Sequence, residues 1–147
     1  LKQWIRFSDA EAMRAGDGLA TRTTGNPSVP RWLASPLSGW FFSADSENAK
    51  YAKHIRSSAG IAVFVSDADD KAHWIEAGRC YERFALQATA LGIRTAFVNQ
   101  PVEVASIRPR FASLLGVAGK RPDLVVRFGR GPAMPGSLRR HVDAVLT

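Results

Sequence analysis

The fold is decided by the stretch Lys71-Ala-His-Trp-Ile-Glu-Ala-Gly-Arg-Cys-Tyr-Glu-Arg-Phe-Ala-Leu-Gln-Ala-Thr-Ala-Leu91. Its apolar residues recur at spacings of three and four, which places them on one face of a helix roughly 30 Å long. Gly92 follows, a residue suited to the left-handed turn that ends many helices. We therefore predict a helix over Lys71–Leu91 that is the buried central pillar of the domain, with Tyr81 and Phe84 largely inside. The apolar stripe consists of Trp74, Ala77, Tyr81, Phe84, Ala88 and Leu91.

One strand-like segment precedes this helix in the sequence, and two follow it. Gly60–Val65 is a short apolar run rich in β-branched residues, and similar runs occupy Arg94–Val98 and Pro122–Phe128. The segment Val102–Leu115 has a helical pattern, interrupted at Pro109 because proline fits poorly inside a helix. Strands that alternate with helices predict a layered α/β or α+β domain.

The first 58 residues have a different character. Ser8-Asp-Ala-Glu11 has the spacing of a helix-capping box, and Gly16 would end the short helix that follows. Residues 21–36 are rich in Thr, Gly, Asn, Pro and Ser and predict a loop. A second helix is expected near Asp45–Ile55. We expect one domain over residues 1–147, with an irregular, helical and lid-like part in residues 1–58 and the sheet and core helices in the rest.

The composition is that of an ordinary globular protein. The chain has 147 residues, of which 46% are hydrophobic and 22% charged. No apolar run approaches the roughly 18 residues of a membrane helix, and the single cysteine, Cys80, excludes an internal disulfide. We therefore expect a cytoplasmic protein with no membrane partner. The opening at Leu1 suggests a segment of a longer chain or a processed chain.

The net charge of +7 favours an anionic partner. Such a charge attracts nucleic acid, an anionic surface or a phosphate-bearing cofactor. A nucleic-acid-binding protein typically has a basic helix face or aromatic residues interleaved with Lys and Arg. The sequence has neither as a block, so we expect no nucleic-acid partner.

The tripeptide Asn99-Gln100-Pro101 directly follows a predicted strand. Ligands in α/β proteins often bind at strand ends, and amide side chains can both donate to and accept from the edge of a planar heteroaromatic ring. On local grounds alone, a plain turn that caps the next helix is the favoured interpretation.

The adjacent arginines Arg139 and Arg140 follow a Gly/Pro-rich loop. Two guanidinium groups can clamp a phosphate, but a solvated surface pair is the more common role for such residues. Gly78, inside the predicted helix, suggests that another backbone packs close to it. No zinc, P-loop, nucleophile-elbow or dinucleotide motif is present, and Cys80 has no histidine at a telling spacing.

Taken in order, several segments resemble the nitroreductase family of flavoproteins. These are the helix Trp74–Gly92, the segment Pro122–Pro132 and the closing segment Ser137–Leu146. Trp4–Phe7 and Asp17–Leu19 resemble the Acg-like subgroup, whose members have two such halves in one chain. The resemblance implies a central, mostly antiparallel sheet flanked by helices, of which this chain would be most of the second half.

The resemblance also implies a flavin mononucleotide (FMN) site, in which Arg139 and Arg140 hold the phosphate and Asn99, Gln100 and Pro101 line the ring. NAD(P)H would reduce the flavin, and a nitro compound or quinone would accept its electrons. No residue is predicted to act as a catalytic acid or base. The arginine-rich stretch that the family carries upstream is absent here, and His141 stands where the family has proline. The missing half or a second copy of the chain, as in a dimer, would therefore have to complete the site.

Two other functions are compatible with the sequence. The chain could store flavin without catalysis, with residues 27–42 as a lid over it. The weaker alternative is nucleic-acid binding through the basic ends, which would require a steep dependence on salt.

Overall fold

The structure, a computed structural model, describes residues 4–24, 28–30, 32 and 44–146. The chain separates into two compact units, which are described one at a time. The first unit comprises Leu1–Glu47 and Pro132–Thr147, and the second comprises Asn48–Gly131.

The second unit is built on a three-stranded antiparallel sheet. The strands are β3 (Gly60–Ser66), β4 (Arg94–Phe97) and β5 (Arg121–Gly129), and β5 lies between the other two. All three were expected from the sequence within two residues at each end. The expected α+β class and the antiparallel sheet are therefore confirmed.

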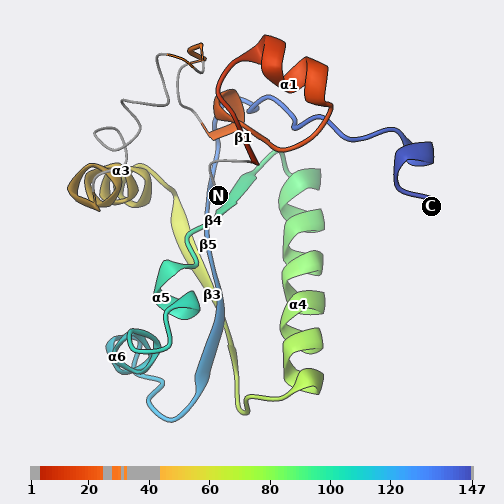
Figure 1. The fold of residues 1–147 in the computed structure, drawn as a ribbon. Coiled ribbons are helices and arrows are strands. Elements are labelled where there is room, and N and C mark those ends of the chain that lie inside the picture. The colour runs from red at the N-terminus through yellow and green to blue at the C-terminus, as the bar shows by residue number, and fades with distance from the viewer. Residues whose placement is uncertain (1–3, 25–27, 31, 33–43, 147) are drawn as a thin grey trace. The chain divides into compact units, whose positions relative to one another are not determined.

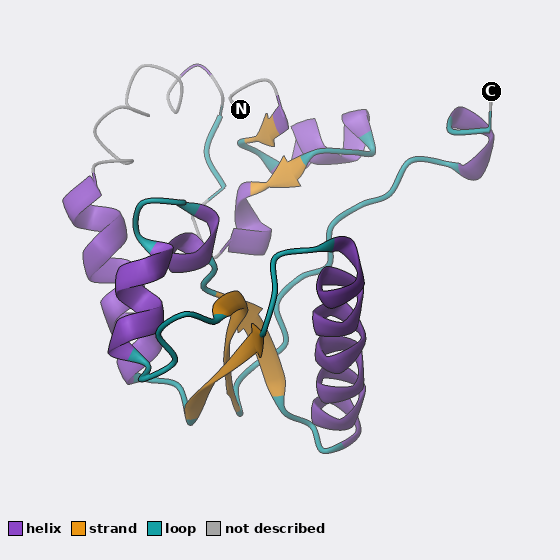
Figure 2. Ribbon diagram, turned by 90° about the horizontal axis from the view of Figure 1, so that it is seen from below, coloured by secondary structure: helices purple, strands orange, loops and turns teal. Residues whose placement is uncertain are grey.

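Helices lie on both sides of this sheet (Figures 1 and 2). Helix α4 (Lys71–Ala90) lies along one side, and α3 (Ala44–Arg56), α5 (Gln100–Glu103) and α6 (Arg108–Leu114) lie on the other. The helices expected at Asp45–Ile55 and Lys71–Leu91 are thus confirmed. The expected interruption of Val102–Leu115 is also present, but Pro109 lies in the first turn of α6, where proline is tolerated.

Side-chain alternation along the strands forms a separate apolar layer on each face of the sheet. On the face of α5 and α6, Val98, Val102 and Val125 are buried together, with Tyr51, Val63 and Phe111 packed against them. On the α4 face, three pairs of aromatic rings pack edge to face, and the rings of Tyr81 and Phe97 are tilted relative to each other. This aromatic layer contains Phe64, Tyr81, Phe84, Phe97 and Phe128.

The prediction that α4 is a buried pillar is wrong. Only Ala77 and Ala88 are buried in this helix, whereas Tyr81 and Phe84 are half-buried. The physical reason is that only one face of α4 contacts the three-stranded sheet. The opposite face has no neighbour among the described residues that covers Ile75 and Leu86, which are 64% and 65% exposed.

The expected close approach of a backbone at Gly78 is also wrong for the described part of the chain. A Cβ atom added at Gly78 would meet no atom within 4 Å. Gly92, in contrast, has the expected role, because its φ of 69° is in the left-handed region that ends helices.

The first unit contains the short parallel strands β1 (Ile5–Arg6) and β2 (Leu19–Ala20), joined through helix α1 (Asp9–Ala15). The side chain of Ser8 accepts a hydrogen bond from the backbone of Glu11, and the helix ends at Gly16, as expected. The described part of this unit also contains the 3-10 turns η2 (Thr21–Thr24) and η3 (Val142–Ala144). Half of the loop expected over residues 21–36, and three quarters of the lid expected over residues 27–42, lie outside the described residues.

Candidate functional site

The predicted phosphate-binding arginines lie in the first unit, on a segment without secondary structure. Arg139 and Arg140 are both exposed. The guanidinium Nε of Arg140 lies 3.6 Å from one carboxylate oxygen of Asp17, and the other oxygen of Asp17 accepts a hydrogen bond of 2.7 Å from Arg6. Exposed guanidinium groups can bind a phosphate, although Asp17 would compete with it for Arg140.

The predicted ring-binding residues lie in the second unit, where β4 ends and α5 begins. The side-chain oxygen of Asn99 accepts a hydrogen bond of 2.8 Å from the backbone N–H of Val125 in the central strand. Gln100 is exposed and opens α5, with Pro101 next to it in the first turn. Asn99 therefore ties the loop to the sheet through its oxygen, and its side-chain NH₂ group is the part suited to a ligand.

The side-chain oxygen of Asn99 has a structural role, and its NH₂ group has the predicted binding role, so substitutions can test the two roles separately. Asn99→Ala should destabilise the protein by about 1–3 kcal/mol, because the N–H of Val125 loses its acceptor in a largely buried strand. Asn99→Asp keeps an acceptor oxygen and removes the NH₂ donor, so it should lose less stability. Urea denaturation of both variants tests this difference. Equal losses would contradict the role of the oxygen.

A second cluster of charged groups surrounds a cavity of about 400 Å³ in the second unit. Its walls come from the loop between β3 and α4, from α6, and from the turn that leads into β5. The lining residues are Asp67, Ala68, Asp69, Arg108, Pro109, Ala112, Ser113, Gly119, Lys120 and Arg121. A cavity of this size is within the range of small-molecule sites, which is about 300–1,000 Å³.

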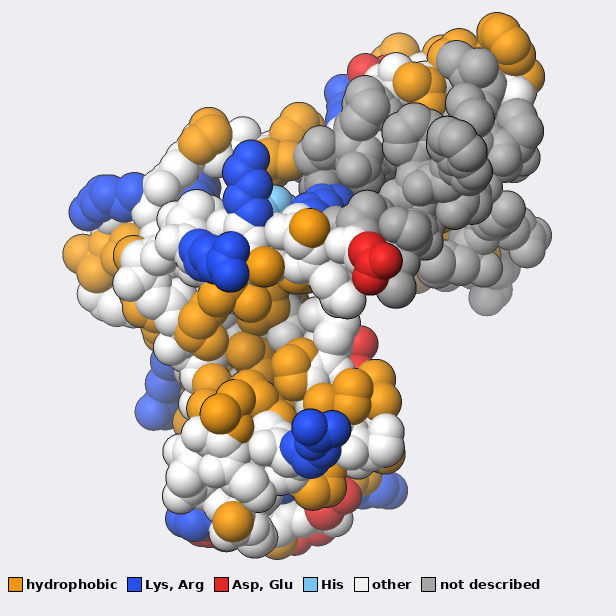
Figure 3. All heavy atoms as spheres, turned by 90° about the vertical axis from the view of Figure 1, so that its left-hand side faces the viewer, with side chains coloured by type: hydrophobic (Ala, Val, Ile, Leu, Met, Phe, Trp, Pro, Cys, Tyr) orange, Lys and Arg blue, Asp and Glu red, His pale blue; other side chains and the backbone are white. Residues whose placement is uncertain are grey.

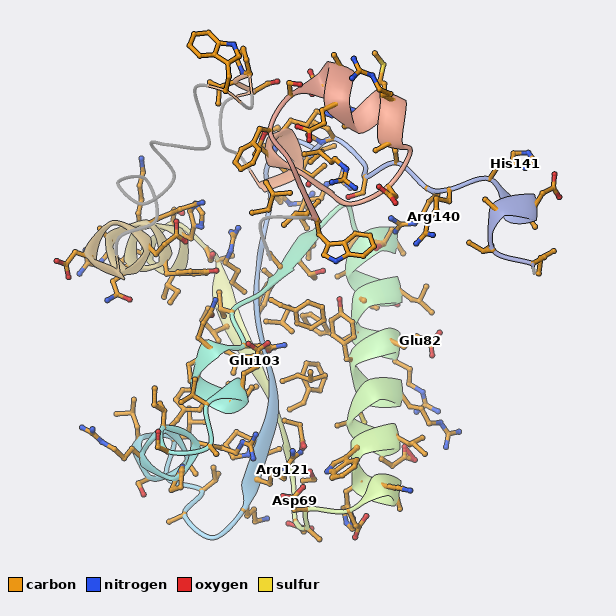
Figure 4. The ribbon with its side chains drawn as sticks, viewed as in Figure 1. Asp69, Glu82, Glu103, Arg121, Arg140 and His141 are labelled. Carbon is orange, nitrogen blue, oxygen red and sulfur yellow. The ribbon has the colours of Figure 1, made fainter. Side chains whose placement is uncertain are left out.

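Arg121 is the centre of this cluster. Its Nε lies 2.8 Å from Asp69, and its Nη1 binds the carboxylate of Asp123, whose side chain is only 5% exposed. The hydroxyl of Ser66 donates to the other oxygen of Asp123. The guanidinium carbon also lies 5.5 Å from the centre of the Trp74 ring, in cation–π range. Asp69 and Arg121 meet at the end of the sheet where α4 begins (Figure 4).

One further ion pair lines the cavity, and another lies at the start of α4. Lys120 lies 2.9 Å from Asp67, and its hydrogen bond and charge hold the pKa of that carboxyl below its ordinary value. At the start of α4, Asp70 accepts hydrogen bonds from the backbone and the ring of His73. These bonds lower the pKa of Asp70 and raise the pKa of His73.

The sequence interpretation assigned no binding role to this cavity. Residues 67–70 contain three aspartates just before the predicted helix, which is typical of a helix start, and Asp70 does cap α4. The partners of Asp67 and Asp69 are more than fifty positions further along the chain, so no local spacing could reveal them. The only feature of the sequence that indicated a charged site here was the pair of basic residues, Lys120 and Arg121, just before a predicted strand.

The surrounding surface is mixed in character. The face that carries α5 and α6 exposes apolar side chains among scattered Lys and Arg side chains (Figure 3). Ile107 and Leu114, at either end of α6, are 45% and 81% exposed. Within the described ranges, no cluster of three or more His, Cys, Asp or Glu side chains is arranged to bind a metal, and no helix has the length and apolar character needed to cross a membrane.

Comparisons of the chain with known protein families, with characterised proteins and with solved structures find no match.

Proposed function

We propose that the chain is part of an FMN-dependent oxidoreductase of the nitroreductase type. The observation that carries the proposal is the exposed arginine pair Arg139–Arg140, which has the charge and the donors that an FMN phosphate requires. The proposal is also supported by the segments that resemble the nitroreductase family and by the order in which they follow one another in the sequence. The α+β class of the fold is compatible with it.

The residues present fit FMN in part. Arg139 has no ion-pair partner among the described residues, so its guanidinium group can donate to a phosphate oxygen. Arg140 can do the same if it leaves Asp17, at 3.6 Å. The exposed amide of Gln100 and the NH₂ group of Asn99 can donate to ring oxygens and nitrogens.

In this proposal the flavin supplies the redox chemistry, taking hydride from NAD(P)H and passing electrons to a nitro compound or quinone. The protein residues bind and orient it. Arg139 and Arg140 hold the phosphate, and the segment Asn99–Pro101 borders the ring. A missing half or a second copy would supply the remaining donors and cover the ring.

The exposed side of α4 is compatible with such a partner. Ile75 and Leu86 are well exposed, and Gly78 leaves open space beside the helix backbone. Because half of a site leaves polar groups unpaired and apolar surface in water, the chain alone should bind FMN weakly.

A fluorescence titration with FMN tests the proposal. The chain alone should bind more weakly than about micromolar, and the intact protein should bind tightly and reduce nitro compounds or quinones with NAD(P)H. Binding without turnover would instead indicate a protein that stores flavin. Submicromolar binding by the chain alone would contradict the proposal that the chain supplies only part of the FMN site.

The arginine pair is tested in the intact protein. Replacing both Arg139 and Arg140 with alanine should weaken FMN binding by at least about tenfold, because each charge-assisted bond contributes about 1.5–3 kcal/mol. Replacing Lys50 and Lys53 of α3 is the matched loss of two positive charges. If the two double variants weakened FMN binding equally, the arginines would not be the residues that bind the phosphate.

A further inference from the structure

The cavity around Arg121 has uncommitted hydrogen-bond donors that the flavin proposal does not use. It lies wholly within the second unit, whereas Arg139 and Arg140 belong to the first. We propose that this cavity binds the oxyanion group of a small molecule, a phosphate or a carboxylate, through Arg108, Lys120 and Arg121.

The three cations keep donors available after their internal contacts are made. Arg108 donates from Nε and Nη2 to the carbonyl of Val102, which fixes the side chain and leaves Nη1 without a partner in the described part of the chain. Arg121 donates from Nη1 to Asp123, and its Nε lies 2.8 Å from Asp69 without hydrogen-bond geometry, which leaves Nη2 without a partner in the described part of the chain. Lys120 has three donors and contacts one carboxylate, that of Asp67. The donors that remain are N–H groups on positively charged side chains, which an oxyanion satisfies best.

Among the residues that line the cavity, the two arginines are less exposed than the two carboxylates, and this favours an anion over a cation. The carboxylates of Asp67 and Asp69 are 78% and 61% exposed, so water solvates them from outside. The side chain of Arg121 is only 21% exposed, and Arg108 is part-buried. The formal charge of the lining is +1, from three cations and two carboxylates, and the buried Asp123 that pairs with Arg121 does not line the cavity.

Opening the internal pairs costs little. The pair of Lys120 with Asp67 is exposed on both sides, and such surface pairs contribute at most about 1 kcal/mol. An oxyanion can also bind the free N–H groups of Lys120 without displacing Asp67. Arg121 is held in place by Asp123 and by the ring of Trp74, so this part of the site is preorganised.

The test is calorimetric titration of the full chain at low ionic strength with inorganic phosphate and, separately, with succinate. Sodium chloride at matched ionic strength controls for screening. Saturable binding of phosphate alone, of succinate alone or of both supports the proposal and identifies the type of oxyanion. Absence of saturable binding of either ion overturns it.

Matched variants locate the binding. Arg108→Gln and Lys120→Gln should each weaken binding by about tenfold or more, since each removes a charged donor. Arg110→Gln removes an exposed arginine from the same helix that does not line the cavity, and it should change binding by less than about twofold. Lys120 is exposed, so its replacement tests the site even if Arg108→Gln disturbs the fold. Equal effects of Lys120→Gln and Arg110→Gln would overturn the proposal.

Discussion

Arg121→Met is expected to destabilise the protein by about 3–5 kcal/mol, the usual cost of leaving a buried charge without its partner. The carboxylate of Asp123 is almost fully buried, and Arg121 is its ion-pair partner. The hydroxyl of Ser66 would remain as a donor to Asp123, but a neutral hydroxyl compensates a buried negative charge only partly. Urea denaturation followed by tryptophan fluorescence measures the loss.

Two further variants make this prediction specific. Adding Asp123→Asn to Arg121→Met removes the unpaired charge and keeps an acceptor for Ser66, so most of the lost stability should return. Arg79→Met breaks an exposed pair with Glu76 on α4, and it should cost less than about 1 kcal/mol. If Arg121→Met cost no more than Arg79→Met, Asp123 would not depend on the arginine for its charge balance.

The elements of the second unit could be predicted because each has a strong local pattern. The β-branched run at Gly60–Val65 and the three-and-four spacing of α4 are local signals, and both elements are present. The burial of α4 could not be predicted in the same way. A helical stripe shows which face of the helix is apolar, but the sheet that covers this face has only three strands, and the sequence does not reveal that number.

The candidate sites illustrate the same limit. The resemblance implied that Asn99 lines a flavin ring, whereas its side-chain oxygen accepts a hydrogen bond from the backbone of Val125, which is 26 positions further along the chain. The cavity is formed by loops and helices that come together only when β3 and β5 pair. Long-range pairs of this kind have no fixed spacing, so a single sequence gives no direct indication of them.

The aromatic layer under α4 should depend strongly on Phe84. Its ring packs edge to face on Phe64 and Phe128, with centroid distances of 5.9 and 5.7 Å. A fully buried phenylalanine replaced by alanine costs about 3–5 kcal/mol; because Phe84 is half-buried, we expect about 2–3 kcal/mol. Urea denaturation of the chain measures this loss.

The control is Leu86→Ala, which removes an apolar side chain from the exposed side of the same helix and should change stability by less than about 0.5 kcal/mol. Equal losses for the two variants would mean that the aromatic layer does not hold α4 to the sheet. Because a second chain on α4 would bury Leu86, a loss at this position that grows with protein concentration would indicate self-association through the helix. A loss at Phe84 alone, independent of concentration, would mean that the chain folds with one side of α4 in water.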